Sequence, residues 1–164
     1  MLTLIIVRHG EASPFSDLGD HGRELTSRGH KQATAAGENI KAWGFAPSLC
    51  LCSDAARARQ TAAHVVEACG LRQGRVVYSK MLYSSYTTQE LIDAVASEAS
   101  GIDGCDCVVV VGHNPDVTYK ADALSHEPLP VAFPTAGVVA LLFDVDNWAD
   151  VGARSGTIIR SSFL

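Results

Sequence analysis

Residues 2–10 read Leu-Thr-Leu-Ile-Ile-Val-Arg-His-Gly, an apolar run that stops abruptly at three residues of a different kind. Leucine, isoleucine and valine over residues 2–7 indicate a buried strand. A guanidinium (Arg8), an imidazole (His9) and a flexible residue (Gly10) stand where this strand ends. Because glycine has no side chain, Gly10 lets the chain turn sharply and approach a ligand closely. The stretch therefore predicts a strand that delivers polar groups to one end of a sheet.

Similar apolar runs recur along the rest of the chain. The four consecutive valines of residues 108–111 are typical of a strand that is covered on both faces. Strands that alternate with helical patterns predict an α/β fold, a three-layer α/β/α sandwich with a mostly parallel central sheet. Further strands are predicted at residues 48–52, 75–78, 106–111, 138–143 and, at an edge of the sheet, 157–160.

The segments between these strands carry helix signals. Thr26 and Ser53 are predicted N-caps, and residues 87–90, Thr-Thr-Gln-Glu, match a capping box. Another helix is predicted from a proline at its first position over residues 115–124. Residues 11–25 are polar and rich in glycine, serine and aspartate, which indicates a loop.

Length and composition favour a globular protein. The chain has 164 residues, of which 47% are hydrophobic and 19% charged, so a single domain over residues 1–164 is expected. A net charge of −5 disfavours nucleic-acid binding, which needs a broad basic surface. No apolar run approaches the roughly 20 residues of a membrane span, and no secretory signal is recognisable. We therefore expect a cytoplasmic protein that binds neither nucleic acid nor membrane.

Five cysteines raise the question of a metal site. An odd number of thiols in a chain of this size does not indicate a disulfide framework. Cys50 and Cys52 are predicted to share one face of a strand, and their spacing is shorter than that of usual structural zinc pairs. We expect buried free thiols, with no metal and no cofactor.

Three polar signatures follow predicted strands, at residues 8–10, 53–61 and 112–115. Ligands of α/β sheets bind beyond the carboxyl ends of the strands, so a single site is expected there. Arg57 lies about one turn into the helix after Ser53, near the positive end of the helix dipole. Arg59 points in another direction and is interpreted as a solvated side chain.

The histidines differ in their settings. His9 at a strand end is a candidate nucleophile, because neutral imidazole with a pKa of about 6.5 is competent near pH 7. The alternative is a histidine that merely caps a loop carbonyl. Arg8 offers a planar fork for phosphate oxygens, and His113 is placed to hydrogen-bond a transferring phosphoryl group. The other histidines are interpreted as surface or hydrogen-bonded side chains: His21, His30, His64 and His126.

Taken in order, these motifs resemble a known family. Arg8-His9-Gly10, the Arg-Glu-Leu-Thr-Ser-Arg-Gly of residues 23–29, and the Ser-x-x-x-Arg-Ala-x-Gln-Thr of residues 53–61 are similar to the histidine phosphatase superfamily. Val-Gly-His-Asn-Pro at residues 111–115 and Phe-Pro-Thr at residues 133–135 continue the resemblance. The short chain lacks the segments inserted in phosphoglycerate mutases and acid phosphatases, so it resembles the SixA-type phosphohistidine phosphatase branch.

The resemblance implies a phosphoglycerate mutase-like fold and a set of roles. His9 would be the nucleophile and become transiently phosphorylated, while Arg8, Arg57 and His113 would bind the phosphoryl oxygens. Arg23, in the position of a loop arginine of SixA-like proteins, would also face the phosphate. No metal would be required, because these cations stabilise the charge of phosphoryl transfer. The implied partner is a phosphorylated histidine-containing protein of a signal-transduction phosphorelay.

The sequence pattern leaves the identity of the proton donor open. Many relatives that act on phosphomonoesters carry a glutamate after the third strand, where this chain has only Glu90, which the capping box also explains. Glu11 is the second candidate, and a solvated loop glutamate explains it equally well. An alkoxide leaving group needs a proton from an acid, whereas the imidazole of phosphohistidine leaves readily once water or the substrate itself has protonated it, so phosphohistidine is the favoured substrate. The alternatives are a small phosphate ester, such as a sugar or nucleotide phosphate, or a phosphate-binding regulatory module without turnover.

Overall fold

The computed structural model describes residues 1–71 and 75–164. Within these residues one sheet has the strand order β3-β2-β4-β1-β5-β6. The first four strands run parallel to their neighbours, whereas β5 is antiparallel to β1 and β6 is antiparallel to β5. The predicted mostly parallel sheet and the late edge strand are confirmed. The strands are β1 Leu2–Arg8, β2 Leu49–Ser53, β3 Val76–Ser79, β4 Cys107–Gly112, β5 Val138–Phe143 and β6 Thr157–Ser161.

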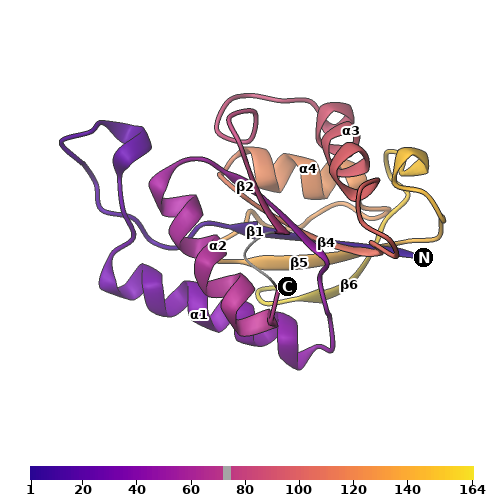
Figure 1. Ribbon diagram of the computed structural model, residues 1–164, viewed down its shortest axis with the longest axis horizontal. Coiled ribbons are helices and arrows are strands. Elements are labelled where there is room, and N and C mark those ends of the chain that lie inside the picture. Colours follow the sequence, from indigo (N-terminus) through magenta and orange to yellow (C-terminus); the bar gives the residue numbers. More distant parts are fainter. Residues whose placement is uncertain (72–74) are drawn as a thin grey trace.

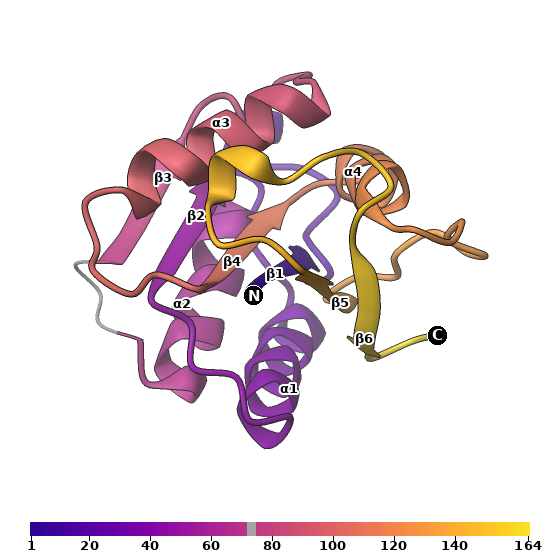
Figure 2. The same ribbon diagram turned by 90° about the vertical axis from the view of Figure 1, so that its right-hand side faces the viewer.

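Helices cover both faces of this sheet (Figure 1). Viewed along the strands, α1 and α2 lie on one side, and α3 and α4 lie on the other (Figure 2). This arrangement is the expected three-layer sandwich. The helices are α1 Ser27–Ala42, α2 Ala56–Cys69, α3 Thr88–Ala99 and α4 Asp116–Leu124, with 3-10 turns η1 Asp20–Gly22 and η3 Trp148–Asp150.

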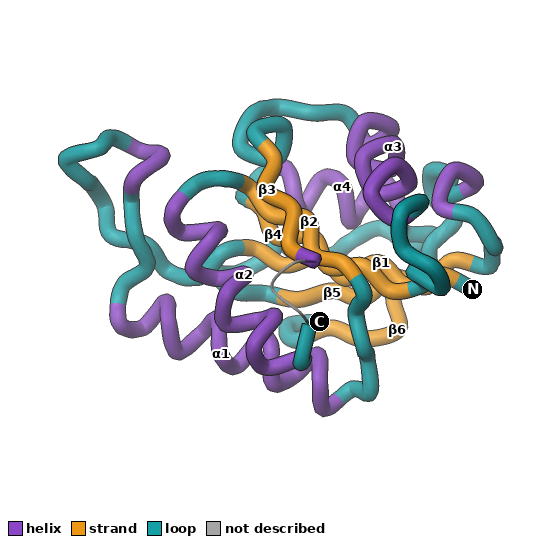
Figure 3. The backbone as a smooth tube through the Cα atoms, viewed as in Figure 1, coloured by secondary structure: helices purple, strands orange, loops and turns teal. Residues whose placement is uncertain are grey.

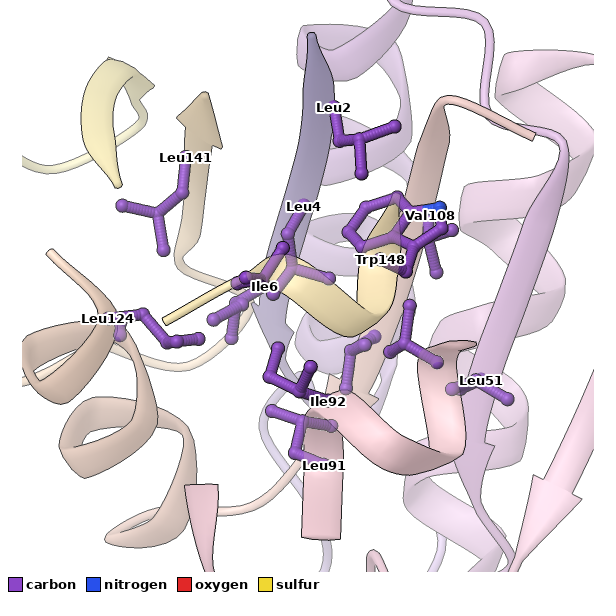
Figure 4. Close-up of a cluster of buried hydrophobic side chains, with 14 of the residues drawn as sticks. Leu2, Leu4, Ile6, Leu51, Leu91, Ile92, Val108, Leu124, Leu141 and Trp148 are labelled. Carbon is purple, nitrogen blue, oxygen red and sulfur yellow. The ribbon is translucent and has the colours of Figure 1, made fainter. Parts of the chain in front are cut away.

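Each face of the sheet carries its own hydrophobic core, because successive strand residues point to opposite faces. Leu4 and Ile6 of β1 belong to the cluster under α3 and α4, drawn in Figure 4. Ile5 and Val7 belong to the cluster under α1 and α2. The valines of β4 divide in the same way, so the prediction of a strand covered on both faces is confirmed.

The observed N-cap residues agree with the predicted ones for α1 and α3 and differ for α2. Thr26 and Thr87 cap α1 and α3, each accepting a hydrogen bond from a backbone N–H three residues on. The prediction that Ser53 caps α2 is wrong, since the N-cap residue is Ala55 and no side chain caps the helix. Ser53 instead continues β2, where it pairs with Ser79 of β3. The extended pairing of the strand therefore delays the helix by two residues.

Two smaller expectations are also corrected or refined. Pro115 occupies the N-cap position of α4, one residue before the first helical position predicted for it. The predicted loop over residues 11–25 contains the turn η1, and Figure 3 shows this loop projecting beyond one end of the sheet.

All five cysteines are free thiols, and every one except Cys69 is buried. Burial raises the pKa of Cys50 and of Cys107 to about 12, so these thiols behave as core residues. Within residues 1–71 and 75–164, no group of three or more His, Cys, Asp or Glu side chains is arranged to hold a metal ion. No helix in the same ranges is long and apolar enough to cross a membrane.

The segment after His9 packs directly on the first turn of α1. A Cβ placed on Gly10 would lie 2.6 Å from the carbonyl oxygen of Gly29. A Cβ placed on Gly29 would overlap the carbonyl oxygen of Glu11. Both contacts involve backbone atoms, which cannot rotate away, so this approach requires glycine at both positions.

Replacement of Gly29 by alanine tests this contact. Helix propensity favours alanine by up to about 1 kcal/mol, but backbone overlap costs about 1–3 kcal/mol. We expect Gly29→Ala to lower the free energy of unfolding measured in urea. The matched control is Gly152→Ala, because no atom lies within 4 Å of its added Cβ. A Gly29→Ala protein more stable than wild type would show that the contact is absent.

Candidate active site

Side chains from three sheet strands and the segments after them meet at one edge. His9 follows β1, His113 follows β4, and Arg57 stands in the first turn of α2, the helix after β2. The two imidazole rings lie 5.1 Å apart between their centroids. All three residues are buried, with exposed fractions of 8% for each histidine and 6% for Arg57. The three polar signatures found in the sequence therefore gather in one place.

The ring of His9 is held in one tautomer. Its Nδ1 lies 2.7 Å from the carbonyl oxygen of Gly10. Its Nε2 accepts a hydrogen bond from Nε of Arg57 over 3.3 Å. A carbonyl accepts and a guanidinium donates, so Nδ1 carries the proton and Nε2 keeps its lone pair. Burial, reinforced by the nearby guanidinium charges, lowers the pKa of His9 to about 4. The ring is therefore neutral at pH 7.

The backbone of His9 is fixed on both sides. Its N–H donates to the carbonyl oxygen of Gly112, and its carbonyl oxygen accepts from the N–H of Ala136. These bonds continue the pairing of β1 with its two neighbours past the end of the strand. The imidazole consequently has a rigid support.

His113 has a different partner, the buried hydroxyl of Ser53, whose Oγ lies 2.7 Å from Nε2. That Oγ accepts from the N–H of Ala55 over 3.3 Å, and Nε2 of His113 is the one acceptor among its described partners, so the buried hydroxyl directs its proton at the ring. The protonated nitrogen of His113 is then Nδ1, which is buried without a hydrogen-bond partner among the described residues. Burial lowers the pKa of His113 to about 3, and the positive charges of its neighbours add to this effect. Sequence reasoning missed Ser53 because its spacing suggested a helix cap.

Arg57 makes three side-chain hydrogen bonds in the site. Besides the contact with His9, its Nη1 donates to the backbone oxygen of Asp20 over 2.8 Å, and Nη2 donates to the Asp20 carboxylate over 3.2 Å. Arg59 does not join it. The Arg59 side chain is exposed, donates to the backbone of Asp54 and lies over the Tyr78 ring, in agreement with its interpretation as a residue outside the site.

The two remaining arginines lie at the margins of the site. Nη1 of Arg8 donates to the carbonyl oxygen of Phe133 over 2.9 Å, and its buried Nε has no partner among the described residues. Arg23 donates through Nε to the backbone of Ser13 and through Nη1 to the carboxylate of Asp20. The charges of both arginines contribute to the low pKa of His9.

The two candidate proton donors do not join the cluster. Glu11 pairs with Arg28 at 3.6 Å, and Glu90 is exposed in the first turn of α3, where its N–H donates to Thr87. Among the described contacts, neither carboxylate touches His9, Arg57 or His113.

The carboxylate that does reach the site is Asp20, which the sequence analysis did not single out. It accepts hydrogen bonds from Arg23, Arg57 and the Tyr83 hydroxyl, the last at 2.7 Å. The Tyr83 bond and the two arginines hold the pKa of Asp20 well below its usual range. No sequence signal marked this residue, because an aspartate in a polar loop is ordinarily a solvated one.

The arrangement as a whole suits a tetrahedral oxyanion. The neutral Nε2 of His9 accepts a hydrogen bond from Arg57, and two buried polar atoms without a partner among the described residues, His113 Nδ1 and Arg8 Nε, belong to residues at the same edge of the sheet. Guanidinium groups match phosphate oxygens in charge and geometry. The site therefore combines an unprotonated imidazole nitrogen with positively charged groups of a kind that can neutralise an oxyanion.

The low pKa values predict how acid affects stability. Unfolded histidine takes up a proton near pH 6.5, whereas buried His9 and His113 resist protonation down to about pH 4 and 3. The unfolded state then binds more protons, so the free energy of unfolding falls as pH drops from 6.5 toward 4. Replacement of His113 by asparagine should reduce this pH dependence in urea unfolding. An unchanged dependence, or an NMR titration of His9 near 6.5, would contradict the burial of these rings.

Comparisons with known proteins place the chain. The family model described as histidine phosphatase superfamily (branch 1) matches residues 4–78. An uncharacterized protein of Mycobacterium tuberculosis is 33% identical over 156 residues, which cover 88% of this chain and 91% of the relative. A 2,3-bisphosphoglycerate-dependent phosphoglycerate mutase of Chelativorans is 39% identical over 74 residues, 42% of this chain and 35% of the mutase.

Solved structures agree with this placement. The protein histidine phosphatase SixA complexed with tungstate superimposes with a TM-score of 0.81 at 21% identity, covering 98% of this chain and 96% of SixA. A chain from Nakamurella multipartitia that carries the SixA name gives 0.74 at 27% identity, covering 98% and 94%. A mycobacterial glucosyl-3-phosphoglycerate phosphatase gives 0.64 at 21% identity, covering 96% and 98%. With its sequence motifs and its fold in agreement, the chain belongs to the histidine phosphatase superfamily.

Proposed function

We propose that residues 1–164 form one phosphatase domain that hydrolyses phosphohistidine through a phosphorylated His9. The observation that carries this proposal is the state of the His9 ring. Its Nε2 is unprotonated and contacts Arg57, while Nδ1–H is bound to the carbonyl oxygen of Gly10. A neutral imidazole with a fixed tautomer is ready to attack phosphorus without first losing a proton.

In the first step the lone pair of His9 Nε2 forms a bond to phosphorus. The bond between phosphorus and the leaving nitrogen breaks, and its electron pair goes to the departing imidazole. His9 then carries a positive charge on its ring, which the carbonyl oxygen of Gly10 stabilises through Nδ1–H. Arg8, Arg23, Arg57 and the Nδ1–H of His113 would neutralise the oxygens of the transferring group.

In the second step water attacks the phosphorus of phosphorylated His9. The phosphorus–nitrogen bond breaks, its electrons return to Nε2, and the protons of the water remain on the released phosphate. His9 is restored to its neutral tautomer. The positive charge needed in both steps comes from protein side chains, so we propose a reaction that requires no metal.

Phosphohistidine is favoured because the site lacks an available carboxylic acid. Glu11 is paired with Arg28, Glu90 lies at a helix start, and Asp20 is paired with two arginines. An alkoxide leaving group forfeits about 10²- to 10⁴-fold in rate without a general acid, whereas a protonated phosphoimidazole already has a good leaving group. Similarity to a protein histidine phosphatase is consistent with this choice.

A small phosphate ester is the second candidate. The observation that favours it is the shared fold of a mycobacterial glucosyl-3-phosphoglycerate phosphatase, which acts on such a molecule. The two substrates are distinguished by rate. We expect turnover of a phosphohistidine protein to exceed that of any sugar phosphate, and a strong preference for one sugar phosphate would favour the second candidate instead.

Replacement of His9 tests the covalent mechanism. His9→Gln should lower kcat by at least about 10³-fold, as removal of a nucleophile does in enzymes that form covalent intermediates. Mixing wild type with ³²P-labelled phosphohistidine protein and denaturing it in alkali, where phosphohistidine is stable, should leave label on His9. Label on serine or cysteine, or full activity of His9→Gln, would refute the mechanism. Loss of wild-type activity in a chelator would refute the metal-independent reaction.

Ser53 is expected to act through His113 as a positioning residue. Ser53→Ala removes the O–H that holds His113 Nε2, so Nδ1 is no longer fixed as the donor. We expect kcat to fall by about tenfold, close to the value of one hydrogen bond to a charged group, with KM changing less. Nitrogen-15 NMR of the His113 ring should show the change of tautomer. Ser125→Ala, at another buried serine, is the control and should alter neither quantity.

A further inference from the structure

The solvent-facing side of the site, which we call its mouth, carries the Asp20 carboxylate, and the proposed reaction does not use this group. Asp20 belongs to the turn η1 and its side chain is 53% exposed, whereas the Arg57 side chain beneath it is 8% exposed. Its two oxygens accept from Arg23 on one side and from Arg57 and the Tyr83 hydroxyl on the other. The carboxylate thus lies between the buried arginine and solvent.

Several bonds besides those of the carboxylate keep η1 in this position. The backbone oxygen of Asp20 accepts from Nη1 of Arg57 over 2.8 Å. The next residue, His21, pairs with Asp54 at 2.8 Å and packs edge-on against the ring of Tyr83. Arg23 ties the end of the turn to the backbone of Ser13. The turn and its carboxylate are therefore held by four residues from outside it: Ser13, Asp54, Arg57 and Tyr83.

The direction of attack places the leaving group on the same side. In phosphoryl transfer the attacking and leaving atoms stand roughly in line, so the leaving group lies opposite Nε2 of His9. His9 is buried, so the remainder of a substrate has to extend toward solvent, and the half-exposed Asp20 carboxylate is bonded to the same Arg57 that contacts Nε2 of His9. The leaving group therefore departs next to a fixed negative charge.

We propose that Asp20 is a specificity-determining residue that favours cationic phosphoimidazoles and disfavours phosphate esters with a second anionic group. The proposal rests on the proposed function of the site and refines its substrate class. A phosphoimidazole that is protonated on its free nitrogen has a positively charged ring, and the Asp20 carboxylate stabilises this protonated form. When the phosphorus–nitrogen bond breaks, the ring leaves as neutral imidazole. A phosphate ester that bears a carboxylate brings a second negative charge next to Asp20. Its leaving-group oxygen becomes more negative as the phosphorus–oxygen bond breaks, which Asp20 also disfavours.

Charge-changing variants and two simple substrates test the proposal. The substrates are N-phosphoimidazole and 3-phosphoglycerate, and the measured quantity is the ratio of their kcat/KM values. Asp20→Asn should shift this ratio by about tenfold toward 3-phosphoglycerate, the size expected when one unit charge a few Å away is removed at a protein surface. Asp20→Glu keeps the charge and Asp17→Asn removes an exposed charge of the same loop, so both should preserve the ratio within about twofold.

Binding of tungstate, a phosphate-like oxyanion, supplies a measurement without chemistry. Removal of a negative charge from the mouth should tighten tungstate binding to Asp20→Asn in calorimetry, with no change in Asp17→Asn. Weaker or equal binding to Asp20→Asn would overturn the proposal. So would an equal loss of kcat/KM on both substrates, or a shift in Asp20→Glu as large as in Asp20→Asn.

Failure of the proposed function gives a different pattern. Wild type that hydrolyses 3-phosphoglycerate but not N-phosphoimidazole would reject phosphohistidine as the substrate class. The tungstate measurement would then still decide whether Asp20 repels anions at the mouth. Turnover of N-phosphoimidazole by wild type, with a ratio unmoved in Asp20→Asn, would keep the proposed function and reject the role of Asp20.

Discussion

The hydrogen bond from Nδ1 of His9 to the carbonyl oxygen of Gly10 determines what this site can do. It selects the tautomer that leaves Nε2 with a lone pair, and burial keeps the ring neutral. The segment that carries this carbonyl lies directly against α1, and it fits there because neither Gly10 nor Gly29 has a Cβ. The chemistry of one nitrogen thus depends on the packing of a loop against a helix.

Burial of the site makes the positive charge of its side chains unfavourable unless negative charge lies nearby. The charges of Arg8, Arg23 and Arg57 all act on His9. Asp20 balances two of them while the site is free, and a phosphoryl dianion would complete the balance when it is bound. The two histidines avoid adding to the positive charge by remaining neutral. We infer that the charges of Asp20 and of the three arginines affect both the free energy of unfolding and the preference between substrates.

Parallel pairing explains how distant segments reach this point. β1, β2 and β4 are neighbours with their carboxyl ends at one edge, so His9, Ser53 and His113 are brought together by register alone. The segment before β5 closes the edge, since the carbonyl oxygen of Phe133 accepts from both Arg8 and Asn114. The phenylalanine of the sequence motif at residues 133–135 therefore contributes its backbone oxygen, which holds the two side chains in place.

The sequence alone determined the alternation of strands and helices and the two-sided burial of β4, because these depend on local periodicity. It also determined that His9 and His113 follow strands and that Arg57 stands in the first turn of a helix, which brings them to one edge of a parallel sheet. Only the tertiary structure decided that Ser53 holds His113 and that Asp20 and Tyr83 meet over Arg57. Asp20 and Tyr83 are 63 residues apart in the chain and lie in irregular segments. No local pattern encodes the path of such loops, which is fixed by the contacts that the folded chain makes.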